Sequence, residues 1–438
     1  MATCPMTAGG SNALASLMSD NPRYAEMFDV NTQTANTGID LDVDYTEAMN
    51  TLRDTAAVQH GSLRKLLGVL EQEFSPIKRE RMTFFSYRAC EIGFRENLIF
   101  SSEGYKESPG VSSIGPNILS MVGKEHKRLR AAAQPLFKRP KVLDWWNKRW
   151  VQETADVLLD RLLDEDAIDL NFELCARMPM ATITRAIGLE GENVLEFRYQ
   201  LDRGTFGAHK LKPEESAASR KWVDDTLRAL IAENTRNPGD NLISGLIECE
   251  ITHEDGSKRP LTEDEIFGYA KLTIFAGGGT TWRQMGITID ALMTNYHFWE
   301  DCVKDRSLLD QAVEEGLRWR ATDPVFPRLC VEDTEVEGVM VPAGVRVDMC
   351  LGAANHDPDK FKNPEQYDIY RDKSHQMGFG FGPHRCLGIE VARQEMIVAI
   401  SGLMDRFPKM RLDPGKPKPR YRGLDHRGMD AVTVRLKG

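Results

Sequence analysis

Residues 378–390, GFGFGPHRCLGIE, surround a single cysteine, Cys386, with four glycines and two phenylalanines. The residues after this cysteine carry apolar side chains at helical spacing, which predicts that Cys386 lies just before the first turn of a helix. The helix dipole and the free N–H groups of that turn favour a thiolate, the metal-binding form of cysteine. Gly380 and Gly388 permit tight turns and the close approach of a flat ligand, while Phe379 would exclude water. Taken alone, the stretch fits either a structural cysteine in a turn or a shielded thiolate ligand of a haem iron.

A second unusual stretch, AGGGTT at residues 276–281, lies within a strongly helical pattern. Three consecutive glycines cost a helix about 1 kcal/mol each relative to alanine. The cost is expected where the helix must kink or where a bulky ligand presses against its backbone. The alternative is close packing against another helix.

Basic side chains that could bind carboxylate groups by charge-assisted hydrogen bonds occur at three places. His126 and Arg130 are four residues apart and share one helix face. Arg328 lies in VFPRLCVED, and His384 lies two residues before the cysteine. The alternative for His126 and Arg130 is an exposed basic helix face.

The combined pattern around the cysteine resembles the haem-thiolate signature of the cytochrome P-450 monooxygenases. The residues that carry this resemblance are Phe379, Gly382, His384, Cys386 and Gly388. The resemblance extends from about residue 80 to the C-terminus, with every landmark in the order of the family. Glu315 and Arg318 resemble the ion-paired Glu-x-x-Arg of the family, and residues 353–371 resemble the meander that precedes the cysteine loop, with His356 where the family often has arginine.

The resemblance implies haem b as cofactor, with Cys386 as the axial iron ligand and no other metal. It also implies an oxygen-activating role for Thr280, whose hydroxyl would help deliver protons. The family usually has Asp or Glu just before that threonine, whereas this chain has Gly279, so protons would take another route, such as water, Thr281 or a side chain from elsewhere. The residues implied to contact the haem are His126, Arg130, Ala276, Arg328, Phe379, Gly380, His384, Cys386 and Gly388.

The implied function is a monooxygenase that inserts one oxygen atom of O2 into an apolar organic substrate, by hydroxylation or O-dealkylation. Because the chain holds no flavin or iron–sulfur segment, electrons would come from NAD(P)H through a ferredoxin and its reductase. Two alternatives share the fold: a peroxygenase driven by hydrogen peroxide, favoured by Gly279, and a non-catalytic haem-based sensor or ligand carrier. A third is a helical protein without haem.

The formal net charge of −10 argues against a nucleic-acid or acidic-membrane binder. The eight cysteines are scattered without a C-x-x-C pair, as expected of reduced thiols in the cytoplasm. No apolar run is long enough for a membrane span, and the N-terminus does not resemble a signal peptide. Lys124, Lys127, Arg128 and Lys138 form a basic cluster that would suit an acidic ferredoxin, or simply aid solubility.

The patterns along the chain predict a mainly α fold with a small β portion (α+β). The resemblance implies the cytochrome P-450 fold, in which one long central helix crosses the haem. Residues 1–40 are expected to be an irregular leader, and residues 41–438 a single domain. Thr262 and Glu265 form a capping box that starts a helix predicted over residues 261–299. Further helices are predicted at 143–163, 176–189 and 220–236, hairpins at 328–351 and a strand within 81–94.

The family resemblance places the substrate pocket at five separated segments. Phe275, Val325 and Phe326 suit an apolar substrate, and Asp323 is either a polar anchor or a residue that terminates a helix before Pro324. The segments are residues 108–120, 198–212, 275–279, 322–327 and 422–424.

Overall fold

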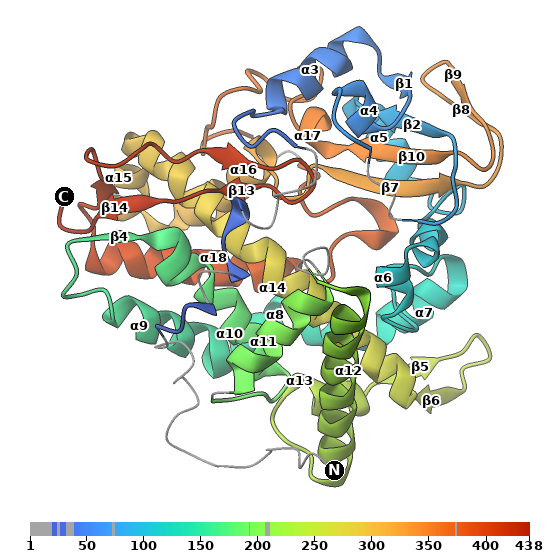
Figure 1. Cartoon of the computed structure of the whole chain (residues 1–438), viewed down its shortest axis with the longest axis horizontal. Coiled ribbons are helices and arrows are strands. Elements are labelled where there is room, and N and C mark those ends of the chain that lie inside the picture. Colours follow the sequence, from blue (N-terminus) through green and yellow to red (C-terminus); the bar gives the residue numbers. More distant parts are fainter. Residues whose placement is uncertain are drawn as a thin grey trace.

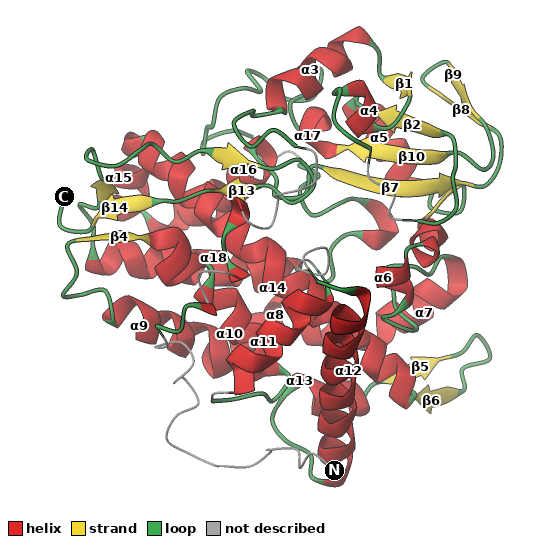
Figure 2. Ribbon diagram, in the orientation of Figure 1, coloured by secondary structure: helices red, strands yellow, loops and turns green. Residues whose placement is uncertain are grey.

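The computed structural model describes residues 20–23, 27–31, 39–71, 75–191, 193–205, 211–372 and 375–438. Most of the predicted leader, residues 1–40, lies outside these ranges, so the domain boundary stays a prediction. Helices form most of the molecule, and the larger sheet gathers with α3, α4, α5 and α17 at one side (Figures 1 and 2). The predicted mainly α fold with a small β portion is confirmed. Among the described residues, no helix is long and apolar enough to cross a bilayer.

The helices differ widely in length, from single turns to eight turns or more. They are α3 (Thr46–Thr55), α4 (Leu63–Leu66), α5 (Tyr87–Arg95), α6 (Pro109–Ser112), α7 (Gly123–Ala133), α8 (Arg139–Lys141), α9 (Gln152–Asp160), α10 (Arg177–Ala186), α11 (Asn193–Gly204), α12 (Pro213–Arg236), α13 (Leu242–Ile247), α14 (Glu263–Thr294), α15 (Tyr296–Lys304), α16 (Leu309–Trp319), α17 (Leu351–Ala354) and α18 (Ile389–Arg406). A π-helical segment, Val142–Val151, leads directly into α9.

The strands form one five-stranded sheet of order β1-β2-β10-β7-β3, one three-stranded sheet of order β11-β14-β4, and three two-stranded ribbons. In the large sheet β10 pairs parallel with β2 and antiparallel with β7. The strands are β1 (Val58–His60), β2 (Arg81–Phe84), β3 (Phe100–Ser101), β4 (Ala167–Asp169), β5 (Glu250–Thr252), β6 (Lys258–Pro260), β7 (Val325–Cys330), β8 (Thr334–Val336), β9 (Val339–Val341), β10 (Arg346–Cys350), β11 (Arg411–Leu412), β12 (Tyr421–Arg422), β13 (Gly428–Met429) and β14 (Thr433–Arg435).

Helix α14 runs through the middle of the molecule and positions the candidate site (Figure 1). The predicted capping box is present: the Thr262 hydroxyl accepts from the Glu265 backbone N–H at 3.2 Å, and the Glu265 carboxylate accepts from the Thr262 N–H at 2.8 Å. The helix packs against α10, α12, α16 and α18, and its second half is buried almost all round. It therefore forms a firmly packed wall for the cavity described below.

The structure corrects the predicted helix over 261–299. Helix α14 ends at Thr294, because Asn295 leaves helical geometry and its side-chain amide donates to the Ala291 carbonyl at 2.9 Å. A separate helix, α15, follows at once. Helix α12 begins at Pro213, seven residues before the predicted start at Arg220, because proline is favourable in the first turn. The helices predicted at 143–163 and 176–189 are confirmed, although the first begins as a π-helix.

The predicted hairpins at 328–351 are confirmed as β7 to β10. The strand predicted within 81–94 is correct only for β2, Arg81–Phe84. The chain then becomes helix α5, because the Ser86 hydroxyl caps it by accepting from the Ala89 N–H at 3.0 Å. A local hydrogen bond therefore overrides the β-type pattern of the later residues.

Glu315 and Arg318 form the expected ion pair on α16 and bind a third residue, Arg371. Nε and Nη2 of Arg318 donate to the Glu315 carboxylate at 2.8 and 2.7 Å, and Arg371 donates to it at 3.1 Å. Arg318 also donates to the carbonyls of Asn355, Pro364 and Gln366. Because Glu315 and Arg318 are buried, this network fixes the meander that leads to the cysteine loop.

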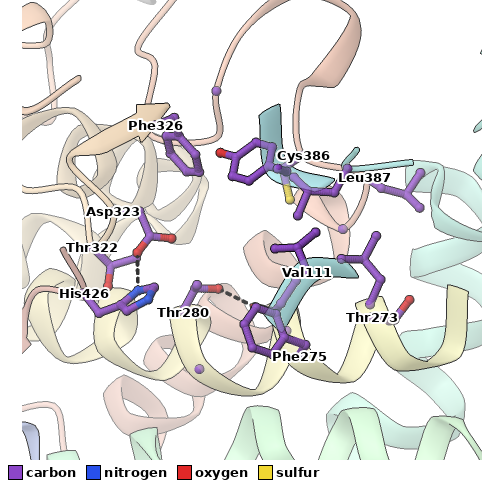
Figure 3. A pocket seen from close by; sticks show the side chains of 18 of the residues that line it. Val111, Thr273, Phe275, Thr280, Thr322, Asp323, Phe326, Cys386, Leu387 and His426 are labelled. Atoms are coloured by element: carbon purple, nitrogen blue, oxygen red, sulfur yellow. Dashed lines mark hydrogen bonds and ion pairs between the residues drawn. The ribbon is translucent and has the colours of Figure 1, made fainter. Parts of the chain in front are cut away.

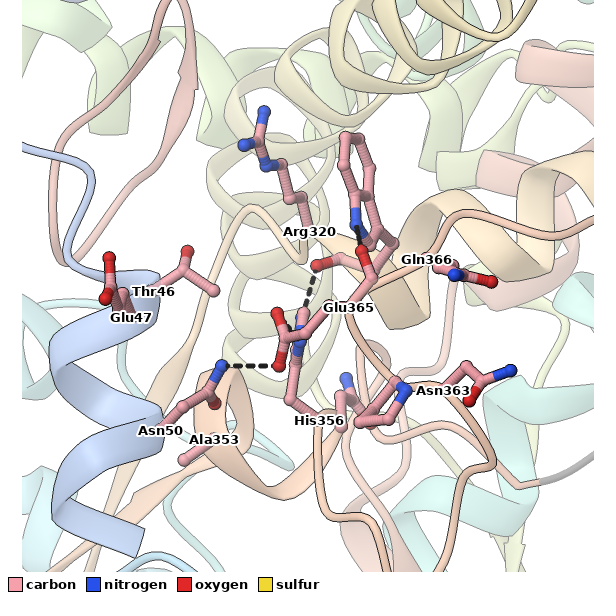
Figure 4. Close-up of polar contacts among 12 residues, drawn as sticks. Thr46, Glu47, Asn50, Arg320, Ala353, His356, Asn363, Glu365 and Gln366 are labelled. Atoms are coloured by element: carbon pink, nitrogen blue, oxygen red, sulfur yellow. Dashed lines mark hydrogen bonds and ion pairs between the residues drawn. The ribbon is translucent and has the colours of Figure 1, made fainter. Parts of the chain in front are cut away.

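His356, where the family often has arginine, is buried at the end of α16 (Figure 4). Its Nε2 lies 2.7 Å from the Trp319 carbonyl oxygen, and its Nδ1 lies 3.2 Å from the Glu365 carboxylate. Asn50 of α3 donates to the same carboxylate at 3.0 Å. The histidine thus joins three segments of the fold, and it lies outside the cavity lining.

Candidate active site

A large cavity of about 1250 Å³ lies between α14 and the cysteine loop, which we define as residues 378–388. Figure 3 shows Cys386 and Leu387 on one side of this cavity and Thr280 and Phe275 of α14 on the other. Residues that are 106 positions apart in the chain, Thr280 and Cys386, therefore face the same space.

The cysteine loop is held by backbone hydrogen bonds and by two residues in left-handed geometry. The Cys386 N–H donates to the Phe379 carbonyl at 2.9 Å, so the loop closes on itself just before α18. Gly380 and Gly382 have φ values of 69° and 68°. A Cβ atom at Gly382 would lie 2.5 Å from the Phe94 carbonyl oxygen, so only glycine fits between this loop and α5.

The sulfur of Cys386 borders the cavity, which accounts for its exposed surface, while protein packs around the rest of the residue. Burial raises the pKa of the thiol, whereas the Gly388 N–H and the charge of Arg130 lower it. Arg130 also donates to the Arg385 carbonyl at 2.6 Å and so ties α7 to the loop. The net effect is a raised pKa, so the protein alone does not favour the predicted thiolate, although the expected donors are present; a bound cation would lower the pKa of the thiol.

On the opposite wall, the glycine run of α14 continues as helix without a break. A Cβ atom at Gly278 would lie 2.8 Å from Nη1 of the buried Arg198, so close approach of another side chain explains this glycine. The Thr280 hydroxyl donates to the Ala276 carbonyl at 2.9 Å. Where the family usually has an acid, the Gly279 carbonyl accepts from Arg283 at 2.6 Å.

A cationic cluster lies beside the cysteine loop. The rings of His126 and His384 are stacked with centroids 3.9 Å apart, and Arg130, Arg328 and His384 line the cavity. Tyr105, which sequence reasoning did not single out, is half-buried, with its hydroxyl 3.5 Å from Arg328. Nε2 of His126 is buried and has no hydrogen-bond partner among the described residues.

The electrostatic environment of this cluster favours the binding of an anion. Burial, and then the charges of Arg130 and Arg328, lower the pKa of His126 to about 4. Burial, the neighbouring His126 and the same two arginines lower the pKa of His384 to about 2. Arg130 donates only to the Arg385 carbonyl, and Arg328 only to Tyr105 and the Pro327 carbonyl, so neither arginine is paired with a carboxylate of the described residues.

Comparisons with known proteins agree with this geometry. The sequence pattern of the family Cytochrome P450 matches residues 289–425. Cytochrome P450 107B1 from Saccharopolyspora erythraea is 31% identical over 331 residues, which cover 75% of this chain and 79% of that protein. This chain belongs to the cytochrome P450 family.

Further cytochromes P450 support the assignment. Cytochrome P450 monooxygenase PikC from Streptomyces venezuelae is 30% identical over 72% of this chain and 75% of that protein. The structure of CYP109E1 from Bacillus megaterium in complex with testosterone has a TM-score of 0.77 at 25% identity, covering 90% of this chain and all of that one. Like its relatives, the chain is a P450 monooxygenase, whose family uses O2 and haem b.

The residues present fit a haem. The sulfur of Cys386 borders one face of the cavity, α14 borders the other, and the cationic cluster lies at the edge, where two propionates would supply the missing negative charge. The orphaned Nε2 of His126 would gain a partner there. A cysteine sulfur, a large open space and a cluster of basic side chains therefore occur together.

The structure brings together all but one of the site residues predicted from the sequence. His126 does not line the cavity and reaches it only through its stack on His384. The residues that do line it are Arg130, Ala276, Gly279, Thr280, Thr281, Arg328, Phe379, Gly380, His384, Cys386 and Gly388. Their individual roles remain proposals.

The predicted pocket segments are also present, with one correction. Parts of 108–120, 198–205, 275–279 and 322–327 line the cavity, and 206–210 lie outside the described residues. Residues 422–424 do not line it: Arg422 belongs to β12 and binds Asp430 at 3.0 Å. The following turn reaches the cavity instead, through Asp425 and His426.

Glu395 of α18 is a buried acid that borders the cavity and that sequence reasoning did not single out. Burial raises its pKa to about 8, which contact with Thr182 only partly offsets. The unfolded chain releases this proton near pH 4.5, whereas the folded chain retains it up to about pH 8. The free energy of unfolding should therefore fall by about 1.4 kcal/mol per pH unit between these values from this residue alone.

We expect Glu395→Gln to remove this contribution, so that the variant gains stability relative to the parent as the pH rises from about 5 to about 8. Urea unfolding of both proteins at several pH values measures the difference. Glu254→Gln, a surface change, should give a difference that does not vary with pH over this range. A pH-independent difference for Glu395→Gln as well would contradict the prediction.

Proposed function

We propose that Cys386 is the axial ligand of a haem b iron and that the protein oxidises an apolar organic molecule by hydroxylation or O-dealkylation. The observation that carries this proposal is the position of the Cys386 sulfur on the cavity wall opposite Thr280. Val325, Phe326 and Phe275 give the space between them an apolar lining. An apolar molecule would gain free energy by leaving water for this space.

Arg130, Arg328 and His384 would hold the propionates by charge-assisted hydrogen bonds. His126, which stacks on His384 outside the cavity lining, would support the orientation of that ring. The Tyr105 hydroxyl would orient Arg328. Phe379, Gly380, Gly388 and Ala276 line the cavity and would contact the ring system. Bound there, haem supplies the activation of dioxygen and the transfer of one oxygen atom.

Thr280 would hold a proton at Oγ1 beside the site of oxygen activation. Its hydroxyl bonds the Ala276 carbonyl within the helix and needs only a side-chain rotation to turn toward the cavity. Gly279 provides no carboxyl group, and Arg283 engages its carbonyl oxygen, so we propose that water near Thr280 and Thr281 completes the proton route. Both threonines line the cavity.

Thr280→Ala should leave substrate binding largely intact but uncouple electron use from product formation. We expect product formed per NAD(P)H oxidised to fall by about a hundredfold, with hydrogen peroxide released instead, at the lower end of the range for a lost proton-transfer group. Thr280→Ser keeps the hydroxyl and should retain most of the coupling. Equal coupling in the alanine variant and the parent would show that this hydroxyl carries no proton.

We propose that electrons arrive from NAD(P)H through a ferredoxin and its reductase in the cytoplasm. Lys124, Lys127 and Lys138 are exposed near α7, the helix whose Arg130 bonds the cysteine loop. Lys124 already binds Glu254 at 2.8 Å, so part of this charge is neutralised within the chain. The remaining charge would attract an acidic partner to the cysteine side.

Reconstitution tests the function directly. Substrate-dependent NADH or NADPH oxidation with a ferredoxin and its reductase, together with a hydroxylated or dealkylated product, would support the monooxygenase. Turnover with hydrogen peroxide alone would instead favour a peroxygenase, for which Gly279 is the motivating feature. Tight binding of carbon monoxide without turnover by either route would favour a haem-based sensor.

A further inference from the structure

One polar pair interrupts the apolar wall of the cavity. Oδ1 of Asp323 lies 2.7 Å from Nδ1 of His426, and both residues border the cavity (Figure 3). Asp323 follows the end of α16, and His426 belongs to the turn between β12 and β13. Asp323 therefore does more than terminate a helix before Pro324.

The segment that carries Asp323 is held rigidly from two sides. The Thr322 hydroxyl donates to the Arg427 carbonyl at 2.7 Å, and the Arg427 N–H donates to the Thr322 carbonyl at 2.7 Å. The Thr322 N–H also donates to Oε1 of Gln284 on α14 at 3.0 Å. The position of the carboxylate is thus fixed before any ligand arrives, which lowers the entropy cost of binding to it.

The one side-chain hydrogen bond of Asp323 to a described residue is made by Oδ1, so its second oxygen, Oδ2, is left for another donor. The Asp323 side chain is 17% exposed, and Figure 3 shows one carboxylate oxygen directed away from His426 into the cavity. Leaving an acceptor oxygen without a hydrogen-bond donor at the edge of a largely apolar space costs free energy. The cavity therefore offers one fixed hydrogen-bond acceptor to a ligand.

A buried arginine lies near this pair. Arg283 is buried on α14, close enough to Asp323 for the charge of that carboxylate to affect its pKa. Burial lowers the pKa of Arg283 to about 10, and Asp323 partly offsets that effect. Arg283 directs Nη1 to the Gly279 carbonyl. Val111, Val325 and Phe326 around the pair are apolar.

We propose that the substrate is an apolar molecule with a hydrogen-bond donor at one end, a hydroxyl or an ammonium group, which binds Oδ2 of Asp323. This inference rests on the proposed function and adds its substrate class. The donor would fix one end of the molecule at the Asp323–His426 pair, so that a carbon some distance away faces Thr280 and the cysteine side. A molecule with a carboxylate at the same end would be rejected by the charge of Asp323.

Four rigid probes of nearly equal apolar size test this proposal: 1-adamantanol, N,N-dimethyl-1-adamantanamine, 1-methoxyadamantane and 1-adamantanecarboxylate. Their dissociation constants are measured by isothermal titration calorimetry on the haem-loaded protein, and independently from the shift of the Soret band. We expect the alcohol and the ammonium to bind at least about tenfold more tightly than the methyl ether, and the carboxylate to bind most weakly, since each tenfold step equals about 1.4 kcal/mol.

Asp323→Asn should abolish the tighter binding of the ammonium probe and raise the dissociation constant of the alcohol by a few fold. The dissociation constant of the methyl ether should not change, and that of the carboxylate should fall. The matched control is Asp425→Asn, since Asp425 borders the same cavity but its carboxylate is already bound by Arg64. This control should leave the order of the probes unchanged. Comparing the alcohol with the ammonium decides which donor the site prefers.

Equal affinities for the four probes, or an order that Asp323→Asn does not alter, would overturn the proposal. The calorimetric readout does not depend on turnover or on thiolate ligation. A protein that retains the haem-thiolate spectrum but fails to discriminate among the probes would therefore refute the substrate class and leave the proposed function intact. The converse result, discrimination without thiolate ligation, would refute the proposed function alone.

Discussion

Replacement of Cys386 by alanine is expected to abolish turnover and the long-wavelength absorption that reduced haem-thiolate proteins show under carbon monoxide. Cys386 is the one cysteine among the described residues that line the cavity, so no other thiolate could bind the iron in its place. Loop folding should survive the change, because the bond that closes the loop is made by the backbone N–H of residue 386 to Phe379. The absorption spectrum of the reduced carbon monoxide complex provides the measurement.

Cys249→Ala is the matched control for this experiment. Cys249 is half-buried, borders no part of the cavity and bonds the Gly245 carbonyl. We expect this variant to keep both the spectrum and the activity. If Cys386→Ala retained them as well, Cys386 would not be the iron ligand, and the assigned roles of the cationic cluster and Thr280 would lose their basis.

Glu315→Gln is expected to cause the largest loss of stability, about 3–5 kcal/mol in the free energy of unfolding. The carboxylate is buried and accepts from both Arg318 and Arg371, so the change leaves two guanidinium groups facing an amide. Because Arg318 also holds three meander carbonyls, the cysteine loop should loosen too. Urea unfolding would report the first effect, and the rate of haem transfer to apomyoglobin the second.

The neighbouring Glu314→Gln provides a matched comparison. Glu314 also binds an arginine, Arg393, at 2.6 Å, but its side chain is 36% exposed and solvent screens the pair. We expect this change to cost less than about 1 kcal/mol. Similar losses for the two variants would mean that burial of the Glu315 network does not decide its contribution.

The sequence alone determined features in which neighbouring residues act on one another. Thr262 and Glu265 are three residues apart, so their capping box is evident from their spacing and marks the start of α14 correctly. The cysteine loop is also local: its glycines, its turn and the helix after it lie within about a dozen residues. The spacing within this loop is therefore sufficient to indicate the family.

Predictions from local sequence patterns were wrong where a capping side chain, and not the apolar periodicity, sets the boundary of a helix. The side chains of Ser86 and Asn295 form short-range hydrogen bonds that start α5 and accompany the end of α14, although the apolar patterns suggested a strand and a continuous helix. Periodicity reports which side chains prefer burial, but caps decide where a helix begins and ends. The same limitation explains the early start of α12 at Pro213.

Only the tertiary structure decided which distant residues share the site. Tyr105 reaches Arg328 across 223 positions, and His426 reaches Asp323 across 103. Neither contact leaves a periodic or motif signal, because it depends on how separate elements pack and not on the spacing within one of them. The sequence thus indicated the cysteine that we propose as iron ligand, whereas packing placed the acceptor that we propose selects the substrate.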